Sequence, residues 1–351
     1  MTLHIPSRRR FLGSVALGGA ALGLVACTSN ETGGDGSENT QVSVGGDNAS
    51  PGAPVTIGFS APAADHGWIA AITRNAQAQA ELYEEVTFLP VEAGEDVTAQ
   101  RAALEALIQQ EPDVIVVLPH DGAQLTATAQ QAMEAGIPVV NLDRIFSSPL
   151  AYRLWIGGDN YGMGVAAGHY IGTRLREAGI EDPVIAEITG ISNLPLTQER
   201  SQGFADALST YGFRVTNQVS AEFTVDSGQE ATANLLQAAP HIDAIWNHDD
   251  DQGIGVLAAI EQAGRDEFFM VGGAGSRDMM EHIQAQDSVI EATVTYSPSM
   301  ASSAISLARL IAQNRGMSDL VELGVPKSIT LASETITRDN VEDYLPLGFA
   351  S

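Results

Sequence analysis

The strongest constraint on the fold is an alternation of short apolar runs with longer segments of helical period, which begins near Val55. Val114–Leu118 and Ile137–Leu142 are nearly unbroken apolar runs, as expected of strands that are covered on both faces. The segment before the first of these runs places Leu104 and Leu107 on one helical face. This βαβ pattern predicts an α/β fold with parallel sheets between layers of helices.

The alternation occurs twice along the chain. After a crossing near residues 155–159, further strands are expected at Pro183–Ile188, Phe213–Val219, Ile242–Asn247, Phe268–Val271 and Val289–Thr295. The residues from Val55 onward number about 300, which is long for one domain, so we expect two doubly wound parallel-sheet domains. A ligand of an open parallel sheet binds beyond the carboxyl ends of its strands, so the residues that follow each strand are the candidate functional residues.

The N-terminus carries an export signal. Arg8, Arg9 and Arg10 precede an uncharged run over Phe11–Ala26 that is too short to span a membrane comfortably. Cys27, the only cysteine, follows this run and resembles the lipidated cysteine of a bacterial lipobox, although an ordinary buried cysteine is the alternative. Residues 1–26 are therefore predicted to be a signal peptide. The arginines also resemble a twin-arginine signal, and the general secretory route stays open.

Residues 27–54 are rich in Gly, Ser, Asn, Asp and Thr and are predicted to be a flexible tether. Removing residues 1–26 changes the formal net charge from -27 to -30. Such a charge argues against nucleic acid and anionic lipid headgroups as partners. From the signal peptide and Cys27 we expect an extracytoplasmic protein, anchored by lipid on Cys27 to the outer face of the cytoplasmic membrane.

Several predicted strands end in polar or aromatic residues. Asp143 and Arg144 follow a strand directly, and a carboxylate beside a guanidinium suits neighbouring hydroxyls of one ligand, with a structural salt bridge as the alternative. Trp68 suits stacking on a sugar ring or packing in the core. His66 suits donation to a ligand or capping of the helix that follows.

The sequence favours neither a metal nor an organic cofactor. His248–Asp251 lacks the alternating acids and later Glu of a calcium loop, so we expect Asp249 to face the ligand and Asp250 or Asp251 to cap the next helix. Gly272–Ser276 departs from a dinucleotide-binding loop because Asp278 stands where the last glycine belongs. It is interpreted as a tight turn with close backbone packing.

No catalytic residues are predicted, because the chain has no Gly-x-Ser-x-Gly or His-Glu-x-x-His motif and no second cysteine. Gly164, Gly168 and Gly172 are spaced by four residues, which predicts a helix pressed closely against its sheet.

The order of the strand-end residues resembles the ribose-binding protein family of sugar carriers, from Val55 to about Ile336. The stretches that carry the resemblance are Gly136–Arg144, Glu199–Phe204, Asn247–Gly255 and Ala292–Tyr296. It implies a type I periplasmic binding protein, with two domains joined by a hinge of three crossovers. Their expected ranges are 55–157 plus about 297–330, and 158–296 plus about 331–351.

The resemblance also implies the ligand contacts. They would be His66, Trp68, Asp143, Arg144, Gln198, Phe223, Asp249 and Tyr296, with Arg200 in a structural role. Four places depart from the ribose carriers: Gln198 stands for Arg, Asp249 for Asn, Tyr296 for Gln, and Gly273–Ala274 for Phe-Asp. These departures argue for a ligand other than ribose, such as another pentose, a branched sugar or a polyol.

The expected function is a monomeric solute-binding lipoprotein that captures a monosaccharide or polyol and delivers it to the permease of an ABC importer. The N-terminal segment has no helix-turn-helix, which excludes a sugar-responsive repressor. Two alternatives stay open: a receptor that presents its ligand to a signalling partner, and an exported hydrolase with Asp121, Asp143 or Asp249 as its base.

Overall fold

The computed structural model describes residues 48–91, 93–318 and 324–351. The predicted signal peptide, Cys27 and most of the predicted tether lie outside the described residues. Within the described ranges, none of the helices is both long and apolar enough to cross a lipid bilayer.

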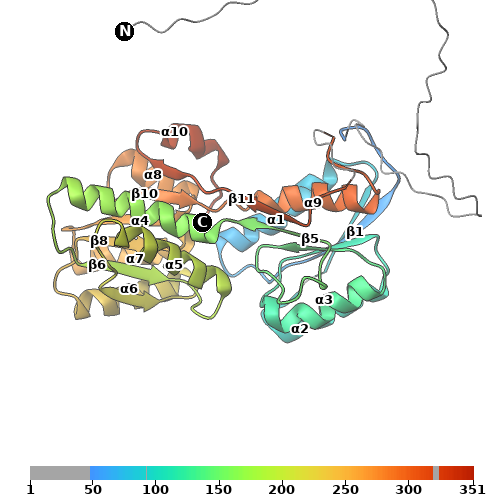
Figure 1. Cartoon of the computed structure of the whole chain (residues 1–351), viewed down its shortest axis with the longest axis horizontal. Helices are drawn as coiled ribbons and strands as arrows, with labels where there is room; N and C mark the ends of the chain where they lie inside the picture. Colours follow the sequence, from blue (N-terminus) through green and yellow to red (C-terminus); the bar gives the residue numbers. More distant parts are fainter. Residues whose placement is uncertain (1–47, 92, 319–323) are drawn as a thin grey trace, which may run out of the picture. The chain divides into compact units, whose positions relative to one another are not determined.

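Two six-stranded sheets organise the described residues (Figure 1). The first sheet has the order β11-β5-β4-β3-β1-β2, and all of its strand pairs are parallel. It forms the lobe that we call the N lobe. Its strands are β1 (Val55–Ser60), β2 (Val86–Pro90), β3 (Val114–Val117), β4 (Val139–Leu142), β5 (Leu154–Gly158) and β11 (Ser328–Leu331). Its helices are α1 (Gly67–Glu81), α2 (Val97–Gln109), α3 (Gly122–Glu134) and α9 (Met300–Ala312). Helices α1 and α9 cover one face, and α2 and α3 cover the other.

The second sheet forms the C lobe, with the order β12-β10-β9-β8-β6-β7. Its strands are β6 (Ile185–Thr189), β7 (Asn217–Ser220), β8 (Ala244–Asn247), β9 (Phe269–Ala274), β10 (Ile290–Thr295) and β12 (Thr335–Thr337). Its helices are α4 (Asn160–Glu177), α5 (Pro195–Ser209), α6 (Val225–Ala238), α7 (Asp250–Ala263), α8 (Arg277–Ala285) and α10 (Val341–Tyr344), followed by the short 3-10 helix η1 (Leu345–Leu347). Only the edge strand β12 is antiparallel to its neighbour among the strands described here.

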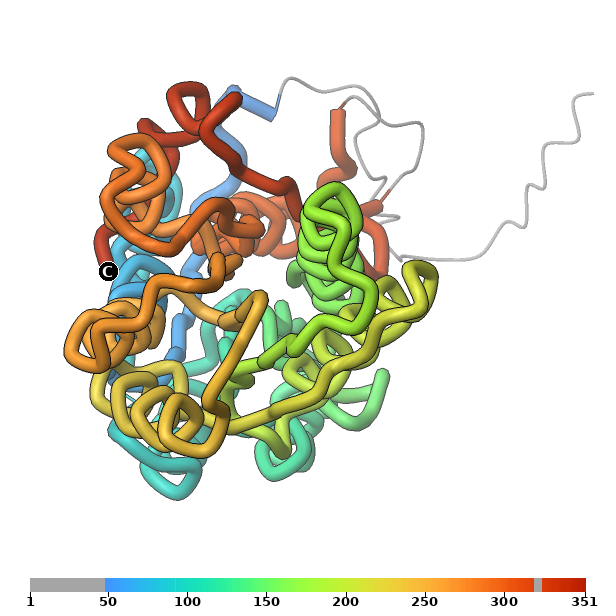
Figure 2. Tube along the Cα trace, turned by 90° about the vertical axis from the view of Figure 1, so that its left-hand side faces the viewer, coloured from blue at the N-terminus to red at the C-terminus, as the bar shows by residue number. Residues whose placement is uncertain are grey.

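The chain passes between the lobes three times: from β5 to α4, from β10 to α9, and from β11 to β12. The predicted fold, two doubly wound parallel-sheet domains with a three-crossover hinge, is confirmed. The last residues then return toward the N lobe, since the carbonyl oxygen of Ala350 lies close to Gly67 at the start of α1 (Figure 2).

The predicted glycine ladder lies on α4 but faces a helix. A Cβ added to Gly164 would lie 2.0 Å from the carbonyl oxygen of Arg200, and one added to Gly168 would lie 2.7 Å from the Cβ of Ala207. Both of these neighbours belong to α5. The prediction that the glycines press α4 against its sheet is therefore wrong, because they bring two neighbouring helices into backbone contact.

Candidate ligand-binding site

Side chains from both lobes and the hinge line a half-open cavity of about 30 Å³. It is lined by His66, Trp68, Asp143, Arg144, Leu196, Arg200, Phe223, Asp249 and Tyr296. The structure thus brings together every predicted contact residue except Gln198. The Gln198 side chain is exposed, and its Nε2 donates to the carbonyl oxygen of Ser192 over 3.4 Å.

Asp143 and Arg144 follow β4 and enter the cavity from the N lobe. Asp143 has φ 61°, a left-handed conformation that Asp tolerates better than most residues, and it turns the chain sharply at the strand end. Arg144 donates from Nη1 to the carbonyl oxygen of His120 over 2.8 Å. Its buried Nε has no hydrogen-bond partner within the described part of the chain. Burial lowers the pKa of Arg144. The pair forms no salt bridge of its own among the ion pairs of the described residues.

Tyr296 closes the hinge side of the cavity. Its hydroxyl donates to Oδ1 of Asp143 over 2.5 Å and accepts from Nδ2 of Asn160 over 3.3 Å. Burial, followed by the charge of Asp143, raises the pKa of Tyr296. The phenol is therefore held in its neutral, donating form at neutral pH.

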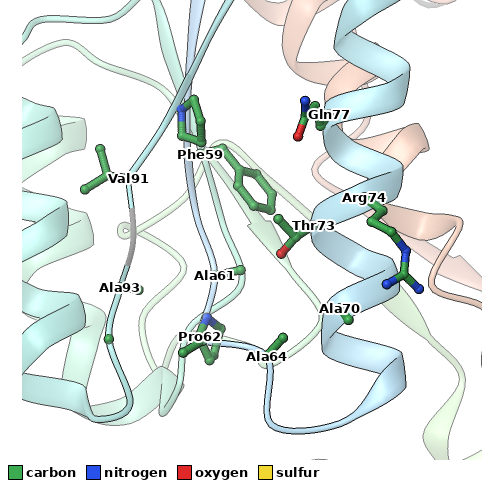
Figure 3. Close-up of a pocket in the computed structure, with 13 residues that line it drawn as sticks. Phe59, Ala61, Pro62, Ala64, Ala70, Thr73, Arg74, Gln77, Val91 and Ala93 are labelled. Atoms are coloured by element: carbon green, nitrogen blue, oxygen red, sulfur yellow. The ribbon is translucent and has the colours of Figure 1, made fainter. Parts of the chain in front are cut away.

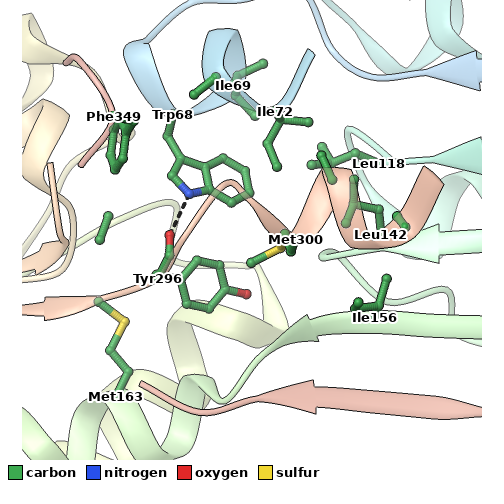
Figure 4. Packing of buried hydrophobic residues seen from close by; sticks show 14 of the residues in the cluster. Trp68, Ile69, Ile72, Leu118, Leu142, Ile156, Met163, Tyr296, Met300 and Phe349 are labelled. Carbon is green, nitrogen blue, oxygen red and sulfur yellow. Dashed lines mark hydrogen bonds between the residues drawn. The ribbon is translucent and has the colours of Figure 1, made fainter. Parts of the chain in front are cut away.

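Trp68, at the start of α1, belongs to both the core and the cavity wall. Its Nε1 donates to the carbonyl oxygen of Tyr296 over 2.8 Å, and its ring lies 5.9 Å from the Tyr296 ring (Figure 4). Met300 and Phe349 belong to the same buried cluster. Because the indole N–H is already used, Trp68 can offer a ligand only its apolar ring surface.

Arg200 is a cavity residue that the sequence interpretation placed in a structural role. It extends from α5, donates from Nε to Asn160 over 2.9 Å and from Nη1 to the carbonyl oxygen of His248 over 3.1 Å, and lies 4.5 Å from the centre of the Tyr296 ring. Leu196 lies one helical turn earlier on the same face. That spacing of four residues could have identified Leu196 and Arg200 together.

The buried pair of His248 and Glu187 supports the His248 backbone, whose carbonyl oxygen accepts from Arg200. Nε2 of His248 lies 2.8 Å from Oε1 of Glu187, and Glu187 also accepts from Ser201 and Gln218. Burial lowers the pKa of His248. Burial alone would raise the pKa of Glu187, but its hydrogen bonds, first that of His248, lower it overall. The guanidinium of Arg200 is therefore fixed by groups in the interior of the C lobe.

Three consecutive aspartates at the start of α7 make different hydrogen bonds. Asp249 is the N-cap: its Oδ1 accepts from the backbone N–H groups of Asp251 and Gln252 over 2.9 and 3.2 Å. Asp250 accepts from the backbone N–H groups of Gly273 and Ser276, each over 2.8 Å, and so fixes the loop after β9. The prediction that Asp250 or Asp251 caps α7 is wrong, because Asp249 both caps this helix and lines the cavity.

Asp251 instead caps a helix of the other lobe. Its Oδ2 accepts from the backbone N–H of Trp68 over 2.8 Å, at the N-terminus of α1. His66 occupies the N-cap position of α1, but its side chain makes no capping hydrogen bond; its Nδ1 lies 2.5 Å from Oδ1 of Asp65. The capping role considered for the His66 side chain is therefore contradicted.

Neighbouring charges shift the pKa values of Asp249 and His66. Burial, followed by the charge of Asp251, raises the pKa of Asp249 to about 7. Burial alone would lower the pKa of His66, but the hydrogen bond with Asp65 and the charge of Asp249 raise it overall. Asp249 therefore titrates closer to neutral pH than an isolated carboxyl group does, and His66 keeps its proton to a higher pH than an isolated imidazole does.

The end of β9 and the turn that follows it pack closely, as interpreted from the glycines of this segment. A Cβ on Gly273 would lie 2.4 Å from the carbonyl oxygen of His248, and Ala274 and Gly275 have φ values of 91° and 76°. No group of three or more acidic, His or Cys side chains in the described residues is arranged to hold a metal ion.

A larger cavity of about 490 Å³ lies between the ends of β1 and β2 and helix α1 (Figure 3). Alanine, proline and other apolar residues form most of its wall, and Thr73, Arg74 and Gln77 of α1 supply its polar side chains. A ligand with many hydroxyls requires donors and acceptors on several sides. The small cavity between the lobes meets that requirement, and this larger one does not.

The chain matches the family model described as periplasmic binding protein domain over residues 57–316. It is 28% identical to the ribose import binding protein of Bacillus subtilis over 245 residues, 70% of this chain and 77% of that protein. It is 29% identical to the ribose import binding protein of Escherichia coli, over 53% of this chain and 60% of that relative. A solved structure from Mycobacterium smegmatis in complex with β-D-fucofuranose superposes with a TM-score of 0.75 at 26% identity, covering 83% of this chain and 94% of that one.

These similarities confirm the resemblance inferred from the strand-end residues. The family model covers strands and helices of both lobes, so the match extends well beyond one strand-end motif. The chain therefore belongs to the periplasmic binding protein family, whose members are extracytoplasmic solute-binding proteins and not enzymes.

Proposed function

We propose that this protein captures a monosaccharide or polyol in the cavity between its lobes and delivers it to an ABC importer. The observation that carries the proposal is the mixture of groups around one small cavity. The wall combines the acceptors Asp143 and Asp249, the donors His66, Arg144 and Arg200, and the rings of Trp68, Phe223 and Tyr296. Paired donors and acceptors beside apolar ring faces suit an uncharged ligand that carries many hydroxyls.

In this proposal Arg144 is the principal donor to the ligand. Its Nε is buried and has no partner in the described structure, and a buried donor without a partner costs stability unless a ligand satisfies it. Asp143 presents its Oδ2 to the ligand, because its Oδ1 is bonded to Tyr296. Gln198 is not among the proposed contacts, because its exposed amide bonds to Ser192.

Binding is proposed to close the hinge. His66, Trp68, Asp143 and Arg144 belong to the N lobe, and Leu196, Arg200, Phe223 and Asp249 belong to the C lobe. A ligand that contacts both sets binds the closed form more tightly and shifts the population toward it. The permease would then recognise the closed monomer, and the partner ATPase would supply the energy of transport. The ribose import role named for the Bacillus subtilis relative supports this reading.

A thermal-shift screen tests the ligand class. The purified protein is heated with pentoses, hexoses, branched sugars, polyols and a few amino acids, because a ligand of the native state raises its melting temperature. We expect a shift with a sugar or polyol and a smaller shift at the same ligand concentration in Arg144→Ala, whose unliganded melting temperature should stay close to that of the parent. A shift with amino acids alone, or turnover of a carbohydrate to product, would overturn the proposal.

The lipid anchor is a further part of the proposal and rests on the N-terminal sequence. Export would remove residues 1–26 and leave a lipidated Cys27 on the outer face of the cytoplasmic membrane. Cys27→Ser should move the protein from the membrane fraction to the soluble fraction. Continued membrane association of that variant would contradict lipidation without affecting the ligand proposal.

A further inference from the structure

We infer that Tyr296 limits the size of the ligand, and that the protein binds an acyclic polyol of three or four carbons more tightly than a pentose or hexose ring. The inference rests on the function proposed above and makes its ligand class specific. Tyr296 stands where the resembling ribose carriers have Gln, so a bulky ring replaces a shorter and narrower side chain at the hinge side of the cavity.

The cavity between the lobes is small. Its volume is about 30 Å³, and a cavity of about 10–15 Å³ on this scale holds one water molecule. There is room for about two water molecules, so every polyol or sugar requires the walls to move apart, and the movement required increases with the size of the ligand. A ring would have to displace part of the wall, and the wall includes the Tyr296 phenol.

The Tyr296 residue is fixed at both ends and along its ring. Its hydroxyl bonds to Asp143 and Asn160, and its backbone carbonyl accepts from the Trp68 indole. Arg200 covers the ring, with 4.5 Å between its guanidinium carbon and the ring centre. A Cβ added to Gly158 would lie 2.2 Å from the ring, so the hinge backbone also touches it. Rotating the phenol out of the cavity would break all of the side-chain contacts together.

Tyr296 also determines which polar groups remain for a ligand. One oxygen of Asp143 is occupied by the phenol, while Nε of Arg144 has no partner in the described structure. Asp249 faces the same space from the C lobe. A short chain with a hydroxyl on each carbon can rotate its bonds to meet these separated groups, because it has no ring geometry to preserve.

A second cavity of about 240 Å³ shares Asp143, Arg144 and Leu196 with the first. Its remaining wall includes Trp155, Asn193 and Glu199. A longer ligand would have to extend past the shared residues into this space. The experiment therefore includes xylitol, a five-carbon acyclic polyol, because tight binding of xylitol would indicate such an extension.

The test is calorimetric titration of the purified protein with glycerol, erythritol, threitol, xylitol, ribose, arabinose and glucose. We expect one of the three shorter polyols to bind at least about tenfold more tightly than xylitol and every sugar, a difference of about 1.4 kcal/mol. If xylitol or a sugar binds as tightly as the short polyols, the size limit is wrong while the proposed function stands. If only ligands that are neither sugars nor polyols bind, both are wrong.

Variants separate the ring of Tyr296 from its hydroxyl. Tyr296→Gln should admit the pentoses and reverse the order of affinities, whereas Tyr296→Phe retains the ring and should retain the preference for short polyols. Tyr161→Phe, on an exposed side chain of α4, is the matched control and should leave every affinity unchanged. If Tyr296→Gln folds, as judged by its melting temperature, and still prefers short polyols, Tyr296 does not set the limit. If this variant does not fold, the order of affinities in the parent protein alone decides the question.

Discussion

The backbone N–H of Trp68 donates to Oδ2 of Asp251 over 2.8 Å, so an aspartate of the C lobe caps the first helix of the N lobe. The N-cap position of α1 has no side-chain hydrogen bond of its own. The first N–H groups of a helix need acceptors, and a carboxylate there also interacts favourably with the helix dipole. This contact exists only when the lobes are together, so it stabilises the closed form independently of any ligand bond.

Asp251→Ala should weaken ligand binding by about 3- to 30-fold, because losing a helix cap costs about 0.5–2 kcal/mol and here the loss falls on the closed form. Calorimetry gives the affinity, and small-angle scattering should show a more open unliganded protein. Asp96→Ala is the matched control: Asp96 caps α2 within the N lobe by accepting from Ala99 over 2.8 Å. It should lower the melting temperature and leave the scattering profile unchanged. Equal scattering profiles for Asp251→Ala and the parent would contradict the closure role.

Arg144→Ala and Asp143→Ala should each weaken binding of the identified ligand by about 10- to 100-fold, since hydrogen bonds to charged groups contribute about 1.5–3 kcal/mol. Both side chains line the cavity, and Asp143 additionally holds the Tyr296 hydroxyl. Titration calorimetry measures the affinities. The half-buried Arg101 side chain bonds to the carbonyl oxygen of Gln124 away from the cavity, and Arg101→Ala should bind as the parent does. Unchanged affinity in both cavity variants would remove the pair from the site.

The strands and their ends could be predicted because parallel strands covered on both faces carry nearly pure apolar runs, and Asp143 and Arg144 follow such a run directly. Arg200 was missed as a cavity residue because it lies on a helix, and helical period alone does not say which neighbour a face meets. The same ambiguity explains the glycines of α4, which face α5. Asp251 reaches a helix almost two hundred residues earlier, and no local pattern reports a contact between lobes.

Gly164→Ala should lower the free energy of unfolding by about 1–3 kcal/mol, the usual cost of overpacking a filled interior. A Cβ there would lie 2.0 Å from the carbonyl oxygen of Arg200, and backbone cannot rotate aside as a side chain can. Denaturant titration measures the loss. Glu177→Ala changes an exposed residue of the same helix and should stay within about 0.5 kcal/mol of the parent. A Gly164→Ala protein as stable as the parent would show that α4 and α5 can separate at little cost.

The Asp249→Asn variant should gain unfolding free energy relative to the parent as the pH rises from about 4.5 to about 8. The pKa of Asp249 is raised from 3.8 to about 7, so the native state binds more protons than the unfolded state between these values. The free energy of unfolding contributed by this group therefore falls as the pH rises through that window. Asn cannot ionise, so the variant escapes this fall, and it can still cap α7.

The measurement is the difference in unfolding free energy between variant and parent, from denaturant titrations at several pH values. The raised pKa of His66 also makes stability fall with rising pH, and taking the difference removes the part of this effect that comes from the hydrogen bond with Asp65, because that bond is present in both proteins. Asp121→Asn is the control of opposite sign. Burial alone would raise the pKa of Asp121, but its hydrogen bonds, first that of Gln124, lower it below 3.8 overall. The stability that the Asp121 carboxylate contributes is lost only in more acidic solution. The difference in unfolding free energy between Asp121→Asn and the parent should therefore stay constant between about pH 4.5 and 8. A constant difference for Asp249→Asn as well would mean that Asp249 is ionised throughout, and that its burial between Asp251 and His66 is relieved by opening of the cleft.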